Sequence, residues 1–299
     1  MQNLKISEIW NEYTPKEKTI SLILFFSTIL SCSFAGATYQ IKTVSINTLI
    51  KFFASGLYYS IPLIIILLSH ELGHFLMAHK YKIMCTLPYF IPLPISILGT
   101  MGAFIKIKSP IYTKKSLFDI GVAGPIAGFI LSTIFIIIFL PYSTVQKVSP
   151  PAPGLYITLG EPLLFKIFSW IYFGNLPQNT DIILHPAALA GWVGYLVTAL
   201  NLIPIGQLDG GHIIYALFGK KHKLIAYIVY FSLFPMVYFF QGWIAWIIIL
   251  LILGIKHPPV IAETMGIYEE LDKKRKILGY ITIIIFFLIF TPQPIRINL

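Results

Sequence analysis

Three titratable side chains lie within five residues of one apolar segment. His70 and His74 are four positions apart, so on a helix both imidazoles project from the same face and can reach one metal ion. Glu71 lies beside the first histidine, where it can hold and deprotonate a water molecule at that metal. Catalytic zinc takes three protein ligands and leaves a position open for water, so the helix predicts a hydrolytic metal centre that needs a third ligand.

The surroundings of this motif strengthen the prediction. In a soluble helix the same spacing could belong to an exposed polar face. Here it follows Ile61–Leu68, a run without any charged residue. Ionisable groups inside such a segment are costly in a membrane and usually mark function, so a metal-binding role is favoured.

The third ligand has few candidates. Apart from Asp272, the aspartates of the chain are Asp119, Asp181 and Asp209. Asp209 stands where Pro204 and neighbouring glycines break an apolar helix. A carboxylate at such a break can turn inward, so we predict Asp209 as the third ligand.

Together the two motifs resemble the site-2 protease family of intramembrane metalloproteases. The segment 70–74, His-Glu-Leu-Gly-His, matches the HExxH helix of that family, and 201–210 matches its NxxPxxxLDG element. Weaker similarity covers 98–105, 118–128 and 257–259. The likeness spans roughly 55–276 and is to the branch without a PDZ domain, found in cyanobacteria and chloroplasts.

The resemblance implies a zinc metalloendopeptidase with one Zn²⁺ per chain. His70, His74 and Asp209 would hold the ion, and Glu71 would be the general base acting on a zinc-bound water. The expected reaction is hydrolysis of peptide bonds within or near transmembrane segments of membrane proteins, as in regulated intramembrane proteolysis. The implied partners are a transmembrane substrate and the lipid bilayer.

Four further residues are expected around the site. Asn201 corresponds to the family asparagine that faces the substrate or the oxyanion, although Leu202 follows it where the family often has proline. Gly102 and Ala103 would contact the substrate backbone. His212 directly follows the Asp-Gly-Gly turn, where it could support the third ligand or simply cap a helix.

The composition is that of a membrane protein. Of 299 residues, 57% are hydrophobic and 11% are charged, against about 25% charged in soluble domains. The net charge of +10 could suggest nucleic acid, but the basic residues flank apolar blocks as topology determinants do, so no nucleic acid is expected. Cys32 and Cys85 lie in or beside apolar sequence and form neither a disulfide framework nor a cysteine zinc site.

We therefore predict an all-α polytopic membrane protein with about 6–7 transmembrane helices. It would form a single membrane-embedded protease domain, 1–299, with a catalytic core at about 55–215 and peripheral helices at 19–39 and 224–291. The first helix is expected to be retained, because no cleavage pattern clearly closes it. The predicted spans are 19–39, 54–79, 117–140, 185–204, 224–240, 241–255 and 277–291.

The basic residues predict the orientation. With the N-terminus cytoplasmic, 17 of the 22 lysines and arginines fall on the inner side. The helix that carries His70 and His74 then runs from outside to inside, so the zinc should lie in the cytoplasmic half of the membrane. The cell or inner membrane of a prokaryote is the expected location.

Two stretches interrupt the helical pattern. Three prolines exclude a continuous helix in 85–108, and its end alternates like a strand from Ala103 to Lys108. We predict a re-entrant loop and a short β-hairpin lining the site, whose strand near Gly99–Lys106 could pair with an extended substrate. The second stretch, 141–184, reads as an outer loop with an interfacial helix at Leu163–Phe173, and its 44 residues leave no room for a PDZ domain.

Two alternatives to a protease remain at this stage. Intramembrane His and Asp also mark ion pathways, so a zinc or cation transporter is one of them. A catalytically dead scaffold is the other. Loss of proteolysis with retained zinc in Glu71→Gln would support the enzyme. The sequence leaves open the substrate, the cleavage position, the gating element and the oligomeric state.

Overall fold

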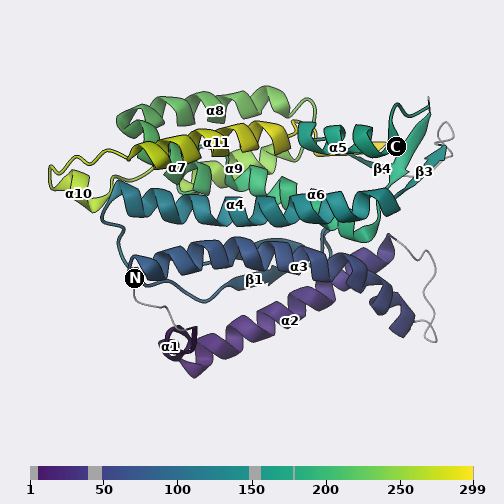
Figure 1. The fold of residues 1–299 in the computed structure, drawn as a ribbon, viewed down its shortest axis with the longest axis horizontal. Helices are drawn as coiled ribbons and strands as arrows, with labels where there is room; N and C mark the ends of the chain where they lie inside the picture. The colour runs from purple at the N-terminus through teal and green to yellow at the C-terminus, as the bar shows by residue number, and fades with distance from the viewer. Residues whose placement is uncertain (1–5, 40–48, 148–155, 178, 299) are drawn as a thin grey trace.

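The computed structural model describes residues 6–39, 49–147, 156–177 and 179–298. Within these ranges three helices are long and apolar enough to cross a membrane: α2 (Pro15–Thr38), α3 (Leu49–Lys80) and α4 (Lys114–Phe139), the last continued by a 3-10 turn to Tyr142. In Figure 1, α3 lies between α2 and α4, and it packs against both. The helix that carries the HExxH motif is therefore enclosed on two sides.

Local sequence sets where two of these helices begin. Thr14 caps α2 and Thr113 caps α4, each accepting a hydrogen bond from the backbone N–H three residues later. The side chains of Glu17 and Ser116 in turn accept a hydrogen bond from the backbone N–H of the capping residue. Each of the two helices therefore begins with a capping box.

The other helices are shorter. They are α1 (Ile6–Asn11), α5 (Leu163–Phe173), α6 (Pro186–Asn201), α7 (Asp209–Phe218), α8 (His222–Met236), α9 (Trp243–Leu253), α10 (Ile261–Thr264) and α11 (Lys273–Ile289). A helix lies in each of the seven predicted spans. However, α6, α8, α9 and α11 have 11–17 residues, against about 20 for a full crossing. The mostly helical membrane fold is confirmed, whereas the number of 6–7 crossings and the single domain stay predictions.

The predicted hairpin is present. β1 (Tyr89–Pro92) pairs antiparallel with β2 (Thr100–Phe104), with Phe90 opposite Ala103. The strand begins and ends earlier than the predicted Ala103–Lys108, and beyond it only Ile107 forms a bridge, to Cys85. The second edge of β2 pairs with no strand of the described chain. A re-entrant path through the membrane stays a prediction.

The outer stretch contains strands that were not predicted. β3 (Thr144–Lys147) pairs with β5 (Thr180–Ile183), and β4 (Tyr156–Leu159) pairs with β6 (Ile295–Asn298) at the C-terminal end of the chain. The predicted helix Leu163–Phe173 is α5, with the same bounds. Part of the predicted outer loop, 148–155 and 178, lies outside the described residues.

The main core lies where α3, α4 and α6 meet. Tyr59, Trp192 and Tyr195 are almost completely buried in it. α3 and α4 are in close contact beside the metal motif, since a Cβ atom on Gly73 would lie 2.6 Å from the carbonyl oxygen of Ala123. Only glycine allows α3 and α4 to approach so closely there.

Candidate metal centre

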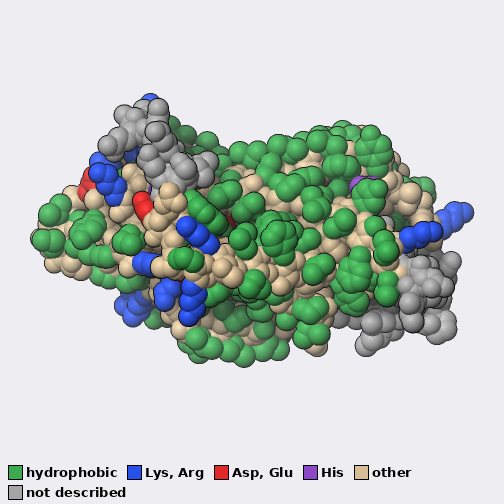
Figure 2. Space-filling model, turned by 90° about the horizontal axis from the view of Figure 1, so that it is seen from below, with side chains coloured by type: hydrophobic (Ala, Val, Ile, Leu, Met, Phe, Trp, Pro, Cys, Tyr) green, Lys and Arg blue, Asp and Glu red, His purple; other side chains and the backbone are tan. Residues whose placement is uncertain are grey.

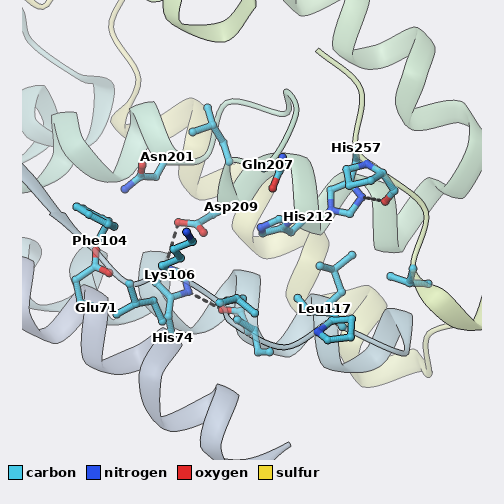
Figure 3. Close-up of a pocket in the computed structure, with 18 of the residues that line it drawn as sticks. Glu71, His74, Phe104, Lys106, Leu117, Asn201, Gln207, Asp209, His212 and His257 are labelled. Atoms are coloured by element: carbon cyan, nitrogen blue, oxygen red, sulfur yellow. Dashed lines mark hydrogen bonds and ion pairs between the residues drawn. The ribbon is translucent and has the colours of Figure 1, made fainter. Parts of the chain in front are cut away.

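Two separate elements bring the three predicted ligands together. His70 and His74 lie one turn apart on α3, and Asp209 is the first residue of α7. A short loop joins α6 to α7, and Gly206 in it has a φ of +57°, a conformation that favours glycine. Both helices follow α4 in one direction, since Gly128 of α4 approaches Thr198 and Gly121 approaches His212. At the start of α7 the Asp209 carboxylate faces the two imidazoles, and Figure 3 shows it directed toward His74.

The donor atoms form a nearly equilateral triangle. Nε2 of His70 lies 3.2 Å from Nε2 of His74, and each nitrogen lies 3.3 Å from Oδ2 of Asp209. Ligands about 2.0–2.1 Å from a tetrahedral zinc ion lie roughly 3.3–3.4 Å from one another. The triangle therefore has the size that zinc requires, and its two imidazoles and one carboxylate are ligands that zinc accepts.

Neighbouring backbone fixes the orientation of one ring. Nδ1 of His74 lies 2.7 Å from the carbonyl oxygen of Ile120. If Nδ1 carries the proton and donates it to this carbonyl, Nε2 is left with a free lone pair toward the triangle. The backbone thus orients the His74 ring so that Nε2 faces the triangle.

Two glycines of α4 make room for the imidazoles. A Cβ atom on Gly124 would lie 2.1 Å from Nε2 of His74, and one on Gly128 would lie 3.0 Å from Nδ1 of His70. That Nδ1 atom is buried and has no hydrogen-bond partner in the described part of the chain. The rings therefore fit into a groove on α4 that any larger residue would fill.

Glu71 is buried beside the triangle, with 5% of its surface exposed. Its carboxylate interacts with the backbone N–H of Ile105, just beyond the end of β2. This contact places the carboxylate between the metal ligands and the strand. A proton acceptor is therefore next to both the metal position and the nearest extended backbone.

A cavity of about 620 Å³ opens onto these groups. Figure 3 shows Glu71, His74, Asn201 and Asp209 around it, with Phe104 and Lys106 on the hairpin side and His212 and His257 on the other. Its volume lies within the range of small-molecule pockets, about 300–1,000 Å³. The three donor residues thus face a cavity large enough for a ligand.

The four further residues predicted around the site lie at different places. Asn201 lies in the cavity, its side-chain nitrogen 3.3 Å from Nε2 of His70. Ala103 also lines the cavity, whereas Gly102 does not. The ring of His212 hydrogen bonds to His257 over 2.8 Å, and its expected support of the third ligand stays a prediction.

The wall of the cavity opposite the hairpin carries His257, for which the sequence predicted no role. The ring of His257 stacks on Tyr215 at a centroid distance of 4.4 Å. The Tyr215 hydroxyl donates a hydrogen bond to Glu263, which also pairs with Lys114 of α4 over 2.5 Å. These contacts hold the segment 257–263 against the cavity. The His-Pro-Pro motif was the available signal, but it gave no indication of the partners.

The chain matches known protein sequences across its central part. The sequence model of peptidase family M50 matches residues 58–239 of the chain. A protein named "Probable zinc metalloprotease EGY1, chloroplastic" from Oryza sativa subsp. japonica is 33% identical over 227 residues, which are 67% of this chain and 38% of that protein. Its namesake in Arabidopsis thaliana is 37% identical over 158 residues, 52% of this chain and 28% of that protein.

A third relative is the Arabidopsis thaliana protein "Probable zinc metalloprotease EGY2, chloroplastic", 28% identical over 237 residues, 75% of this chain and 40% of that protein. The chain thus spans less than half the length of these relatives. All of the residues in the metal triangle lie inside the segment that the family description covers.

Proposed function

The chain belongs to peptidase family M50, and on that basis we propose that it is an intramembrane zinc metalloprotease that cleaves membrane-protein substrates within or near their transmembrane segments. The observation that carries the proposal is the triangle of His70, His74 and Asp209 with Glu71 beside it. All four groups lie in or against a helix long and apolar enough to span a membrane. We propose one Zn²⁺ per chain.

The chemistry divides between the ion and the residues. When bound, zinc supplies a Lewis acid that polarises a carbonyl oxygen and makes water acidic enough to attack near neutral pH. Glu71 accepts the proton from the attacking water at its carboxylate and delivers it to the nitrogen of the leaving amine. Burial of Glu71 keeps that carboxylate away from bulk solvent while it holds the proton.

Asn201 is proposed to bind the substrate carbonyl. Its side-chain amide lies beside the metal triangle and faces the cavity. An N–H donor in that position can stabilise the negative charge that develops on the carbonyl oxygen during attack.

The hairpin is proposed to receive the substrate. A transmembrane helix hides its carbonyl groups in internal hydrogen bonds, so it must unwind locally before it is cleaved. The free edge of β2 offers unpaired backbone groups to the unwound segment. Ala103 and the Ile105 contact with Glu71 place this edge beside the base.

We further propose an orientation with the N-terminus and the metal centre on the cytoplasmic side, as the lysine and arginine distribution indicates. The membrane of a prokaryotic cell remains part of this proposal. The names of the relatives place those proteins in chloroplasts instead.

The test compares wild type with Glu71→Gln in proteoliposomes that contain a panel of single-span substrates. We expect wild type to cleave a substrate and the variant to lose cleavage by at least about a hundredfold, while both bind one zinc per chain. Zinc uptake into the vesicle lumen by both proteins, without cleavage by either, would instead support a transporter. Zinc binding by neither protein would support a scaffold.

A further inference from the structure

A second cavity lies directly behind the loop that carries Asp209. Its volume is about 290 Å³. Leu202, Pro204 and Gly210 form its floor. Because Asp209 lines the metal cavity and Gly210 lines this one, adjacent residues of one backbone turn separate the two spaces. We name the second cavity the rear groove.

The walls of the rear groove come from α8 and α11. Val229, Ser232 and Leu233 line it from α8, and Thr282 and Phe286 line it from α11. The hydroxyls of Ser232 and Thr282 already donate hydrogen bonds to carbonyl groups of their own helices. The groove thus offers an apolar surface with no polar group in need of a ligand.

Basic residues gather at one end of these walls. Both helices begin at the α4 N-terminal end, because Gly219 approaches Lys114 just before α8 and Arg275 pairs with Asp119 at the start of α11. Lys223 lies two residues before Ile225, which lines the groove, or about 3 Å along the helix. The exposed lysines at this end are Lys220, Lys221, Lys223, Lys273 and Lys274.

The acidic residues nearby are already paired. Glu263 pairs with Lys114, Glu269 with Lys115, Glu270 with Lys276, and Asp272 with Arg275. Within the described chain, the five exposed lysines make no ion pair. An apolar groove with uncompensated positive charge at one end complements a molecule with one apolar chain and an anionic head.

We propose that the rear groove binds one acyl chain of an anionic phospholipid, with its phosphate near the lysines that open α8 and α11. The proposal rests on the membrane placement proposed above. A helix about 10–12 Å wide would fill 290 Å³ in less than one turn, so the groove fits a single chain better than a substrate helix. Lipid there would pack against Pro204 and Gly210, behind the metal loop.

The experiment measures retained lipid in the absence of any protease substrate. The full chain is reconstituted in vesicles of equimolar phosphatidylglycerol and phosphatidylcholine, extracted in mild detergent, and examined by native mass spectrometry. We expect one retained phosphatidylglycerol per chain, enriched about tenfold over phosphatidylcholine, roughly the effect of one to two lysines near a headgroup. Equal retention of both lipids would overturn the anionic preference.

Two variants test the groove itself. Val229→Trp and Ser232→Phe place bulk in the groove and should each remove the retained lipid. Ile228→Trp is the matched control, because Ile228 is 60% exposed on the same helix and does not line the groove. Identical lipid retention in all three proteins would overturn the proposal, and a folded elution profile for Ser232→Phe guards against misfolding of the larger substitution.

A third set tests the headgroup. Replacing Lys221, Lys223, Lys273 and Lys274 together by glutamine should keep one lipid but reduce its enrichment to the vesicle ratio. The control replaces Lys80 and Lys82, exposed lysines at the end of α3, by glutamine. Equal enrichment in both variants would overturn the assigned headgroup position. Because no cleavage is measured, these outcomes are independent of whether the chain is a protease.

Discussion

At the scale of single residues, the metal triangle depends on positions that carry no donor atom. Gly124 and Gly128 on α4 leave the space in which the two imidazoles lie. The backbone carbonyl of Ile120 sets the free nitrogen of His74. A ligand motif on α3 therefore becomes a metal centre only when α4 presents glycine and a carbonyl group to it.

The first prediction concerns Gly124. In Gly124→Ala the new methyl group would lie 2.1 Å from Nε2 of His74, so the ring must leave the triangle. Loss of correct ligand orientation typically lowers metal affinity 10–100-fold. Zinc titration with a competing chelator should show this weakening. Ile130→Ala, an exposed position on the same helix, should leave zinc affinity unchanged.

The second prediction concerns Asn201, whose amide lies beside the triangle without belonging to it. If that amide stabilises charge on the substrate carbonyl, Asn201→Ala should lower kcat about 10²–10³-fold. Its zinc content and KM should change little. Zinc loss equal to that of a ligand variant would assign Asn201 to the metal site instead.

At the scale of elements, β2 connects the hairpin to the base. Its unpaired edge and the Ile105 contact with Glu71 lie on one wall of the cavity. A proline at Ala103 removes one backbone N–H and should lower cleavage at least tenfold if the substrate pairs with this strand. Met101→Ala, an exposed change on the same strand, is the control. Unchanged cleavage in Ala103→Pro would exclude strand pairing there.

The segment 257–263 forms another wall, and its ion pair gives it a pH dependence. Burial raises the pKa of Glu263, but hydrogen bonds from Lys114 and Tyr215 lower it by more than burial raises it. The pKa of Glu263 therefore lies below its ordinary value. A lowered pKa in the folded state stabilises the fold above the unfolded value of about 4.3, and this stability is lost as the pH falls through the folded pKa.

Hydrogen exchange of the Ala262 amide, which bonds to the carbonyl of Tyr112, measures this contribution. In Glu263→Gln at pH 7 we expect roughly fivefold faster exchange, because the partly exposed pair contributes about 1 kcal/mol. In the wild type, the same loss of protection of the Ala262 amide should occur only below about pH 4, where Glu263 becomes protonated. Glu270→Gln, which removes an exposed pair, should exchange like wild type at pH 7.

The elements also show what the sequence could predict. Apolar blocks and capping residues are local signals in the sequence. The helices α2, α3 and α4, and even the bounds of α5, could therefore be predicted from it. The pairing of β4 with β6 joins Tyr156 to Asn298 across nearly half the chain, and four-residue strands carry no periodic signal strong enough to indicate such partners. The contact between His212 and His257 was not predicted for a similar reason, because the two residues are 45 positions apart.

At the scale of the whole molecule, the chain is an elongated body with charge concentrated toward its ends. Figure 1 places α10 near one end and β3 and β4 near the other. Figure 2 shows a face that is largely hydrophobic between basic residues on either side. The end near α10 is the lysine-rich end, where α8 and α11 begin. The metal triangle lies nearer this end, since its two histidines are in the last three turns of α3.

This polarity leads to the last prediction, which tests the orientation of the molecule. Cys32 and Cys85 are buried, so an introduced exposed cysteine should be the main site of reaction with a membrane-impermeant maleimide. In right-side-out membranes, Gln146→Cys on β3 should react at once. Glu270→Cys, at the lysine-rich end, should react only after the membrane is opened, because positively charged loops stay on the cytoplasmic side. The reverse pattern would invert the protein and move the metal centre to the outer half of the membrane.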